Sequence, residues 1–264
     1  WFLARVMAQH CRNRSGAGIF APSRLQLPAG NGNRALEQGC ATAGRKGQGV
    51  LDRMSEIKRI PGNYEAYLFD MDGTLLTSIP VVERVWSDWA KRVGVPFADV
   101  LAYLHGRRGI DTVSHFAPPH VSIAEETAWV EAQEIADVNG VAPIAGALEL
   151  LTSLRPDQWA VVTSASRALA LRRLEAAGLP LPRVLITSDD VQNGKPDPEG
   201  FLLAASRLGV DIKRCLVFED ADAGLRAGLA AGAQVVRLSG PHGASQSAEV
   251  PTISDYIGLR LGNA

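Results

Sequence analysis

The chain has 264 residues, and its 46% hydrophobic content is enough to bury a sizeable core in one large domain or two small ones. Its formal net charge of −1 gives no indication of a nucleic-acid or membrane partner. No apolar run is long enough to cross a bilayer. The three cysteines are too few and too scattered for a disulfide framework or a CxxC metal site, which predicts a reducing, cytoplasmic location.

Residues 1–58 differ in composition from the rest of the chain. The first fifty residues carry seven basic side chains, one acidic side chain and eight glycines, without a helical or strand period. This composition predicts a disordered or non-native leader over residues 1–58. An organelle transit peptide and sequence ahead of a start at Met54 are both compatible with it, so the fold prediction begins near Glu56.

Short apolar segments of strand type alternate with helical patterns from Glu65 onward. The five predicted strands are Ala66–Asp70, Trp159–Thr163, Val184–Thr187, Cys215–Glu219 and Gln234–Leu238. Helical patterns over 166–177 and 198–208 each end before a glycine. Alternation of this kind predicts an α/β fold, a doubly wound parallel sheet made by residues 59–78 and 144–240. In the tail, residues 241–264, we expect Pro251–Leu261 to pack as a last helix.

Nearly ninety residues separate the first two predicted strands, where a simple crossover needs a single helix. Pro80 begins a helical pattern of valines and tryptophans that stops at Gly94, and Ser122 with Glu125 forms a capping-box pattern ahead of another helix. A short helical stretch lies around 99–104. The segment 79–143 is therefore predicted to be a small all-helical subdomain inserted into the α/β domain.

The segment after the first strand carries two carboxylates two residues apart. Asp70 and Asp72 follow the apolar strand and are followed by Gly73. Alternate residues of an extended chain point the same way, so both carboxylates can converge beyond the end of the strand while Gly73 permits a sharp turn. Open α/β sheets bind ligands at this edge, which indicates a functional site.

The other predicted strands end in polar residues suited to phosphate or a cation. Ser164 places a hydroxyl at the end of the second strand, and a proline-framed loop after the third presents Lys195. Glu219 and Asp220 end the fourth strand, at the same edge of the sheet. Clustered carboxylates repel one another unless a cation is present, and hard oxygen ligands beside phosphate favour Mg²⁺.

In the same order, these residues resemble the four motifs of the haloacid dehalogenase superfamily, over residues 64–240. The resemblance implies Asp70 as nucleophile and Asp72 as general acid and base, and hydrolysis through an aspartyl-phosphate. The implied phosphate ligands are Ser164, Lys195 and Gly73. The implied Mg²⁺ ligands are Asp70, the Asp72 carbonyl, Asp220 and, in an auxiliary place, Glu219.

The inserted segment is similar to the helical cap of one branch of this superfamily, which closes over the site and selects substrates. Its loop from 104 to 109 carries His105, Arg107 and Arg108 between glycines, and we expect these three side chains to contact substrate. A basic turn exposed to water is the alternative.

Residues 72–95, 105–112 and 159–166 look like the bacterial sugar and hexitol phosphatases of this superfamily. The resemblance implies a small phosphate monoester as substrate, a hexose or polyol phosphate first of all. We expect no other partner than this substrate, and a monomer or weak homodimer. A phosphoglycolate or glycerol-phosphate phosphatase, a β-phosphoglucomutase-like phosphotransferase and a non-catalytic protein of the same fold stay open as alternatives. Thr74 favours a phosphatase over a mutase.

Overall fold

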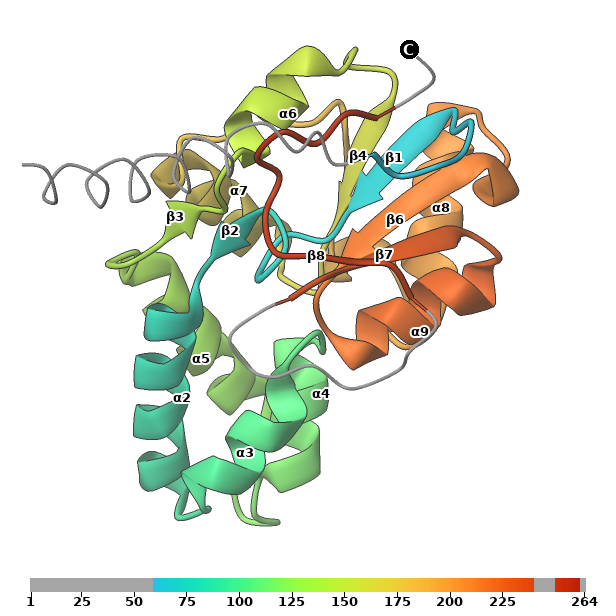
Figure 1. Ribbon diagram of the computed structural model, residues 1–264. Helices are drawn as coiled ribbons and strands as arrows, with labels where there is room; N and C mark the ends of the chain where they lie inside the picture. Colours follow the sequence, from blue (N-terminus) through green and yellow to red (C-terminus); the bar gives the residue numbers. More distant parts are fainter. Residues whose placement is uncertain (1–58, 240–249, 262–264) are drawn as a thin grey trace, which may run out of the picture. The chain divides into compact units, whose positions relative to one another are not determined.

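The computed structural model describes residues 59–239 and 250–261, so the predicted leader over 1–58 lies outside the described residues. Six strands form one sheet, every neighbouring pair of them parallel (Figure 1). In spatial order they are β5 (Val184–Ile186), β4 (Trp159–Val162), β1 (Ala66–Phe69), β6 (Cys215–Glu219), β7 (Gln234–Leu238) and β8 (Thr252–Ile253). The predicted α/β fold is confirmed, and the first five strands agree with the predicted segments to within one residue.

Helices cover both faces of this sheet, which makes it doubly wound. They are α6 (Ala147–Ser153) and α7 (Arg167–Ala176) on one face, α8 (Glu199–Leu208) and α9 (Asp222–Ala231) on the other. Successive residues of β1 alternate between the two cores: Phe69 packs with Leu174 of α7, and Leu68 with Phe201 of α8. Both faces are buried, so the central strands read as continuous apolar runs in the sequence.

Four helices occupy the stretch between β1 and β4 that was predicted as an inserted helical subdomain. They are α2 (Ile79–Val93), α3 (Phe97–Leu104), α4 (Gly109–Phe116) and α5 (Ile123–Ala136). They share their own apolar core around Trp89, and α2 ends at Gly94 in the left-handed conformation. Two short antiparallel strands, β2 (Leu76–Thr77) and β3 (Ala142–Pro143), pair where the chain leaves and re-enters the α/β domain. None of the described helices is long and apolar enough to span a bilayer.

The prediction of a last helix over Pro251–Leu261 is wrong. This segment instead forms β8 beside β7 and continues into turns. The Arg237 N–H donates to the Pro251 carbonyl, because the edge of β7 offers main-chain groups that a new strand can pair. Beyond β8, Tyr256 is buried against Phe69 and Phe218 of the sheet, so the segment completes one face of the core.

The parallel arrangement brings the carboxyl ends of β1, β4 and β6 to one edge. Phe69 at the end of β1 is paired with Val161 of β4 and with Phe218 of β6. The residues that follow these positions therefore emerge side by side. The inserted helices lie at the same edge of the sheet (Figure 1).

Candidate active site

Three carboxylates meet where β1 and β6 end. The Asp70 N–H donates to the Phe218 carbonyl at 2.9 Å, which holds the first residue after β1 beside β6. Asp70, Glu219 and Asp220 each offer a carboxylate oxygen, and these oxygens all lie within 4.8 Å of one another. Asp70 and Glu219 are 5% and 0% exposed, so water gives this negative charge little screening.

Lys195 lies among these carboxylates and is itself buried. Its Nζ donates to Asp70 Oδ1 at 2.5 Å, to Glu219 Oε1 at 2.7 Å and to the Val162 carbonyl at 3.1 Å. The three N–H groups of the ammonium thus each have one acceptor, and these acceptors come from the ends of β1, β6 and β4. The predicted lysine is therefore fixed at the point where these three strands meet.

The burial of this cluster changes how readily its members ionise. Burial raises the pKa of the Asp70 carboxyl to about 7, although the Lys195 ammonium opposes the rise. Burial also raises the pKa of Asp220, and the nearby Glu219 and Asp70 add to the effect. For Lys195, burial lowers the pKa, but Asp70 and Glu219 outweigh it and leave the pKa above its ordinary value. The cluster therefore stabilises positive charge.

The donor set fits a divalent metal ion. If all three carboxylates are ionised, one ammonium leaves two negative charges uncompensated in a largely buried place, and an ion such as Mg²⁺ would balance them and favour that ionisation. All the available side-chain donors are hard oxygens, which Mg²⁺ prefers. Asp70, Glu219 and Asp220 are therefore the residues able to hold it.

Gly73 allows Asp220 to approach the loop that follows β1. Its φ is +86°, and a Cβ at this position would lie 2.1 Å from Asp220 Oδ2. The adjacent Thr74 Oγ1 donates to Asp220 Oδ1 at 3.1 Å. The Gly73 N–H donates to the Leu76 carbonyl within the loop. The structure thus gives Gly73 a close contact with a predicted metal ligand, while phosphate binding by Gly73 stays a prediction.

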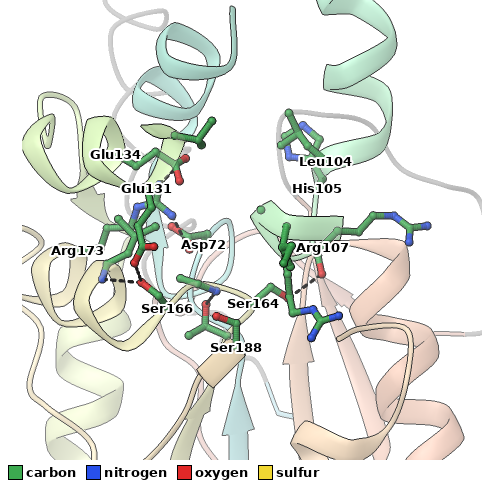
Figure 2. A pocket seen from close by; sticks show the side chains of 18 of the residues that line it. Asp72, Leu104, His105, Arg107, Glu131, Glu134, Ser164, Ser166, Arg173 and Ser188 are labelled. Carbon is green, nitrogen blue, oxygen red and sulfur yellow. Dashed lines mark hydrogen bonds and ion pairs between the residues drawn. The ribbon is translucent and has the colours of Figure 1, made fainter. Parts of the chain in front are cut away.

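The Asp72 carboxylate has a partner that the sequence analysis did not identify. Arg173 of α7 lies with Nη1 3.0 Å from Asp72 Oδ2 and with Nη2 3.1 Å from Glu134 Oε1 of α5. Arg173 and Glu134 are buried, and burial raises the pKa of Glu134 while Arg173 opposes the rise. Figure 2 shows Asp72, Arg173 and Glu134 gathered along one side of a pocket.

A signal for these two residues is present in the sequence. Arg173 falls on the face of α7 that also carries Leu169, Ala170 and Leu174, and Glu134 lies one turn after the buried Val130 of α5. A charged residue on an apolar helical face has to be paired inside the protein. Helical periodicity therefore marked both residues as buried, although it could not show that they meet.

Ser164 joins the end of β4 to the inserted helices. Its Oγ donates to the Gly106 carbonyl at 2.9 Å. Nearby, Arg108 donates to Asp111 through Nε at 2.8 Å and to the Gln192 carbonyl through Nη1 at 2.9 Å. These hydrogen bonds hold the loop 104–109, which carries the predicted substrate contacts, at the edge of the sheet.

A cavity of about 410 Å³ lies between this loop, α5 and the sheet edge. Of the predicted site residues, it is lined by Asp70, Asp72, Ser164, Asp220, His105, Arg107 and Arg108. Lys195 and Glu219 are not among its lining residues. The guanidinium of Arg107 lies 4.2 Å from the centre of the Tyr103 ring, so both loop arginines have partners within the protein. Figure 2 shows Ser164 and Ser188 at the base of this cavity and His105 across it from Glu134.

Comparison with known proteins identifies relatives of this chain. Hexitol phosphatase A of Escherichia coli (strain K12) is 42% identical over 181 residues, which are 67% of this chain and 84% of that protein. Fructose-1-phosphate phosphatase of the same bacterium is 31% identical over 182 residues, which are 66% of this chain and 95% of that protein.

The solved structure of a hydrolase from Pseudomonas syringae matches the fold with a TM-score of 0.66 at 25% sequence identity. The match covers 74% of this chain and 95% of that one. A family model, described as haloacid dehalogenase-like hydrolase, matches residues 64–232. That range contains β1, β4 and β6, the strands whose ends build the site. The chain therefore belongs to the haloacid dehalogenase-like hydrolases.

Proposed function

We propose that this protein is a Mg²⁺-dependent phosphatase that hydrolyses small phosphate monoesters of sugars or sugar alcohols through an aspartyl-phosphate. The observation that carries the proposal is the placement of Asp70 and Asp72 just after β1, where both line a cavity of about 410 Å³ beside a largely buried acidic cluster. The activities of the two named relatives, which act on a hexitol phosphate and on fructose 1-phosphate, support the substrate class.

The proposed reaction has two steps, both on the chain's own carboxylates. The Asp70 carboxylate attacks phosphorus in line, and the phosphorus–oxygen bond to the sugar breaks while Asp72 gives a proton to the departing oxygen. Water then attacks the phosphorus of the aspartyl-phosphate, Asp72 accepts a proton from that water, and inorganic phosphate leaves. The sum is one ester and one water consumed, and one alcohol and one phosphate formed.

Lys195 and the acidic residues have separate proposed parts in this reaction. Lys195 donates to Asp70 and so orients the attacking carboxylate toward the cavity. Asp70, Asp220, the Asp72 carbonyl and the auxiliary Glu219 are the proposed ligands of Mg²⁺, which would supply positive charge next to the phosphoryl oxygens. Ser164 and Gly73 complete the proposed phosphate site with Lys195.

The lining of the cavity supports a hydroxyl-rich substrate. Ser166, Ser188 and Glu131 line it together with the proposed specificity residues His105, Arg107 and Arg108. Hydroxyl and carboxylate groups exchange hydrogen bonds with the hydroxyls of a sugar or polyol, and the volume falls in the usual range for small-molecule sites. The proposal includes a cytoplasmic enzyme, supported by the scarcity of cysteine, that acts as a monomer or weak homodimer.

The test is release of inorganic phosphate from hexose, hexitol, glycerol and glycolate phosphates, with and without Mg²⁺. We expect Mg²⁺-dependent release that is greatest with a hexose or hexitol phosphate and is abolished in Asp70→Asn. Asp88→Asn, on the exposed surface of α2, is the matched control and keeps full activity. Interconversion of glucose phosphates without phosphate release would identify a phosphotransferase, and no turnover of any ester would reject catalysis.

A further inference from the structure

Arg173 is buried at 4% exposure and bridges two carboxylates from different parts of the chain. Asp72 follows β1, whereas Glu134 belongs to α5 of the inserted helices. The Arg173 guanidinium thus connects the sheet edge to the inserted helices at the side of the cavity. Figure 2 shows that these three side chains face one another there.

Packing alone does not account for this arrangement. Removing an ion pair from water costs more than a well-packed apolar group of the same size, so a buried arginine between two carboxylates is a poor device for stability alone. The Arg173 Nε and the Asp72 Oδ1 are both buried without a hydrogen-bond partner among the described residues. Asp72 therefore keeps one oxygen unengaged while Arg173 holds the other.

We propose that Arg173 is a positioning residue: it fixes the orientation of the Asp72 carboxylate and, through Glu134, makes that orientation depend on the contact of α5 with α7. The inference rests on the proposed function, in which Asp72 exchanges protons with the leaving group and with water. One oxygen of Asp72 is held by Arg173 at 3.0 Å, and Asp72 lines the cavity, so we assign the proton exchange to the other oxygen, which has no partner among the described residues. When α5 packs against α7, the Glu134 carboxylate pairs with Arg173 and completes the bridge.

This role can be separated from simple structural support by the choice of leaving group. An alkoxide leaving a hexitol phosphate needs a proton from Asp72 as the phosphorus–oxygen bond breaks. Acetate leaving acetyl phosphate and 4-nitrophenolate leaving 4-nitrophenyl phosphate are stable anions and need no proton. Because kcat/KM covers only the steps up to transfer of phosphorus to Asp70, it reports the protonation of the leaving group and excludes the later attack of water.

The experiment compares kcat/KM for a hexitol phosphate with kcat/KM for two activated substrates, the acyl phosphate acetyl phosphate and the aryl ester 4-nitrophenyl phosphate, in the whole chain with Mg²⁺. For Arg173→Met we expect a loss of about 100-fold with the hexitol phosphate and of about threefold or less with the activated substrates. Arg173→Lys keeps the charge but cannot bridge two carboxylates in the same plane, so we expect a smaller loss with the same preference for activated substrates. Glu134→Gln tests the link to α5, with an expected selective loss of about tenfold for the hexitol phosphate.

Arg172→Met is the matched control, because Arg172 is the preceding residue of α7 and its side chain is 40% exposed and paired with Glu175. It is expected to leave both classes of substrate unchanged. Equal losses with all three substrates in Arg173→Lys and in Glu134→Gln would overturn the inference and assign Arg173 to structural support. Failure of the wild-type protein to hydrolyse any ester would instead reject the proposed function, so the two failures are distinguishable.

Discussion

The ammonium group of Lys195 is buried beneath the Asp70 carboxylate, and the contacts it makes are both electrostatic and geometric. Two of its three acceptors are carboxylates, and the third is the Val162 carbonyl at the end of β4. Removing one partner of a buried ion pair leaves the other charge uncompensated, which costs more than the pair itself contributes. Lys195 is therefore expected to matter for folding as well as for activity.

We predict that Lys195→Met lowers the free energy of unfolding by about 3–5 kcal/mol and removes phosphatase activity. Denaturation by urea, followed by circular dichroism, measures the first effect. Because the variant leaves three carboxylates together without the ammonium, Mg²⁺ should restore more stability to it than to the wild type. Lys91→Met is the control, since Lys91 is on the surface and its pairing with Asp88 is worth little. Unchanged stability in Lys195→Met would contradict this account.

Alanine substitutions at Gly73 and Gly94 can distinguish the effect of backbone strain from the effect of crowding at the site. Both have positive φ, +86° and +76°, but only at Gly73 would a Cβ meet Asp220; at Gly94 it would meet nothing within 4 Å. Both alanine variants are expected to lose about 1 kcal/mol of stability to strain. We predict that only Gly73→Ala also loses Mg²⁺-dependent activity. Measuring thermal unfolding and phosphate release for both variants tests this, and equal activities would show that Asp220 adapts to the added methyl group.

At the scale of elements, the short 3₁₀ helix η2 (Ser188–Asp190) ties the end of β5 to two helices. Asp190 accepts hydrogen bonds from Thr187 at 3.0 and 2.8 Å and from Arg207 of α8 at 3.0 Å, and it pairs with Arg167 of α7 at 3.0 Å. Ser188 and Asp189 of the same turn line the cavity. A single carboxylate therefore holds one wall of the cavity in place.

We predict that Asp190→Asn lowers the free energy of unfolding by about 1–3 kcal/mol at pH 7. Partial burial opposes ionisation, but the hydrogen bonds from Thr187 and Arg207 outweigh it and hold the pKa of Asp190 below its ordinary value. A lowered native pKa gives stability that is present above the unfolded pKa of about 3.9 and is lost as the pH falls through the native pKa. Urea denaturation should therefore show the two proteins converging below about pH 4. A difference that does not change with pH would contradict the prediction.

Elements with strong local signals could be predicted from the sequence, and the others could not. The five central strands are apolar runs, and α2 has a proline near its start and Gly94 at its end. The short helix α4 was missed because it begins at a glycine and buries only Thr112 and Val113. The strand β8 has two residues and exists because it pairs with β7, a contact that no local pattern encodes.

The site shows the same division between local and distant information. The sequence placed the predicted carboxylates and hydroxyl at strand ends and the lysine in a loop after a strand, and the parallel sheet brings the ends of β1, β4 and β6 to one edge. It did not reveal the bridge made by Arg173, because Glu134 lies 39 residues away on a helix of the inserted segment. The partners of a buried charge depend on how whole elements pack, which periodicity does not determine.

At the scale of the whole molecule, the net charge is only −1, although Asp70, Glu219 and Asp220 concentrate negative charge in one site. If Mg²⁺ binds this site only in the folded protein, it stabilises the native state by mass action, by about 2.7 kcal/mol at a hundred times its Kd. We predict that EDTA lowers the melting temperature and that Mg²⁺ restores it. In Asp220→Asn the effect of Mg²⁺ should be largely lost, while Asp99→Asn, at an exposed position of α3, should respond like the wild type. A melting temperature insensitive to EDTA in the wild type would contradict Mg²⁺ binding.

The contact between Tyr256 and the loop after β1 also determines when, during synthesis, the site gains all of its supporting contacts. The Tyr256 hydroxyl donates to the Thr74 carbonyl at 3.1 Å, across 182 residues of sequence. A ribosome adding roughly 5–20 residues each second needs about 10–35 s to pass from one residue to the other. The strand that precedes Asp70 is made first, yet the loop after it gains this hydrogen bond only when Tyr256 emerges. The nascent protein is thus expected to acquire activity only after Tyr256 has left the exit tunnel.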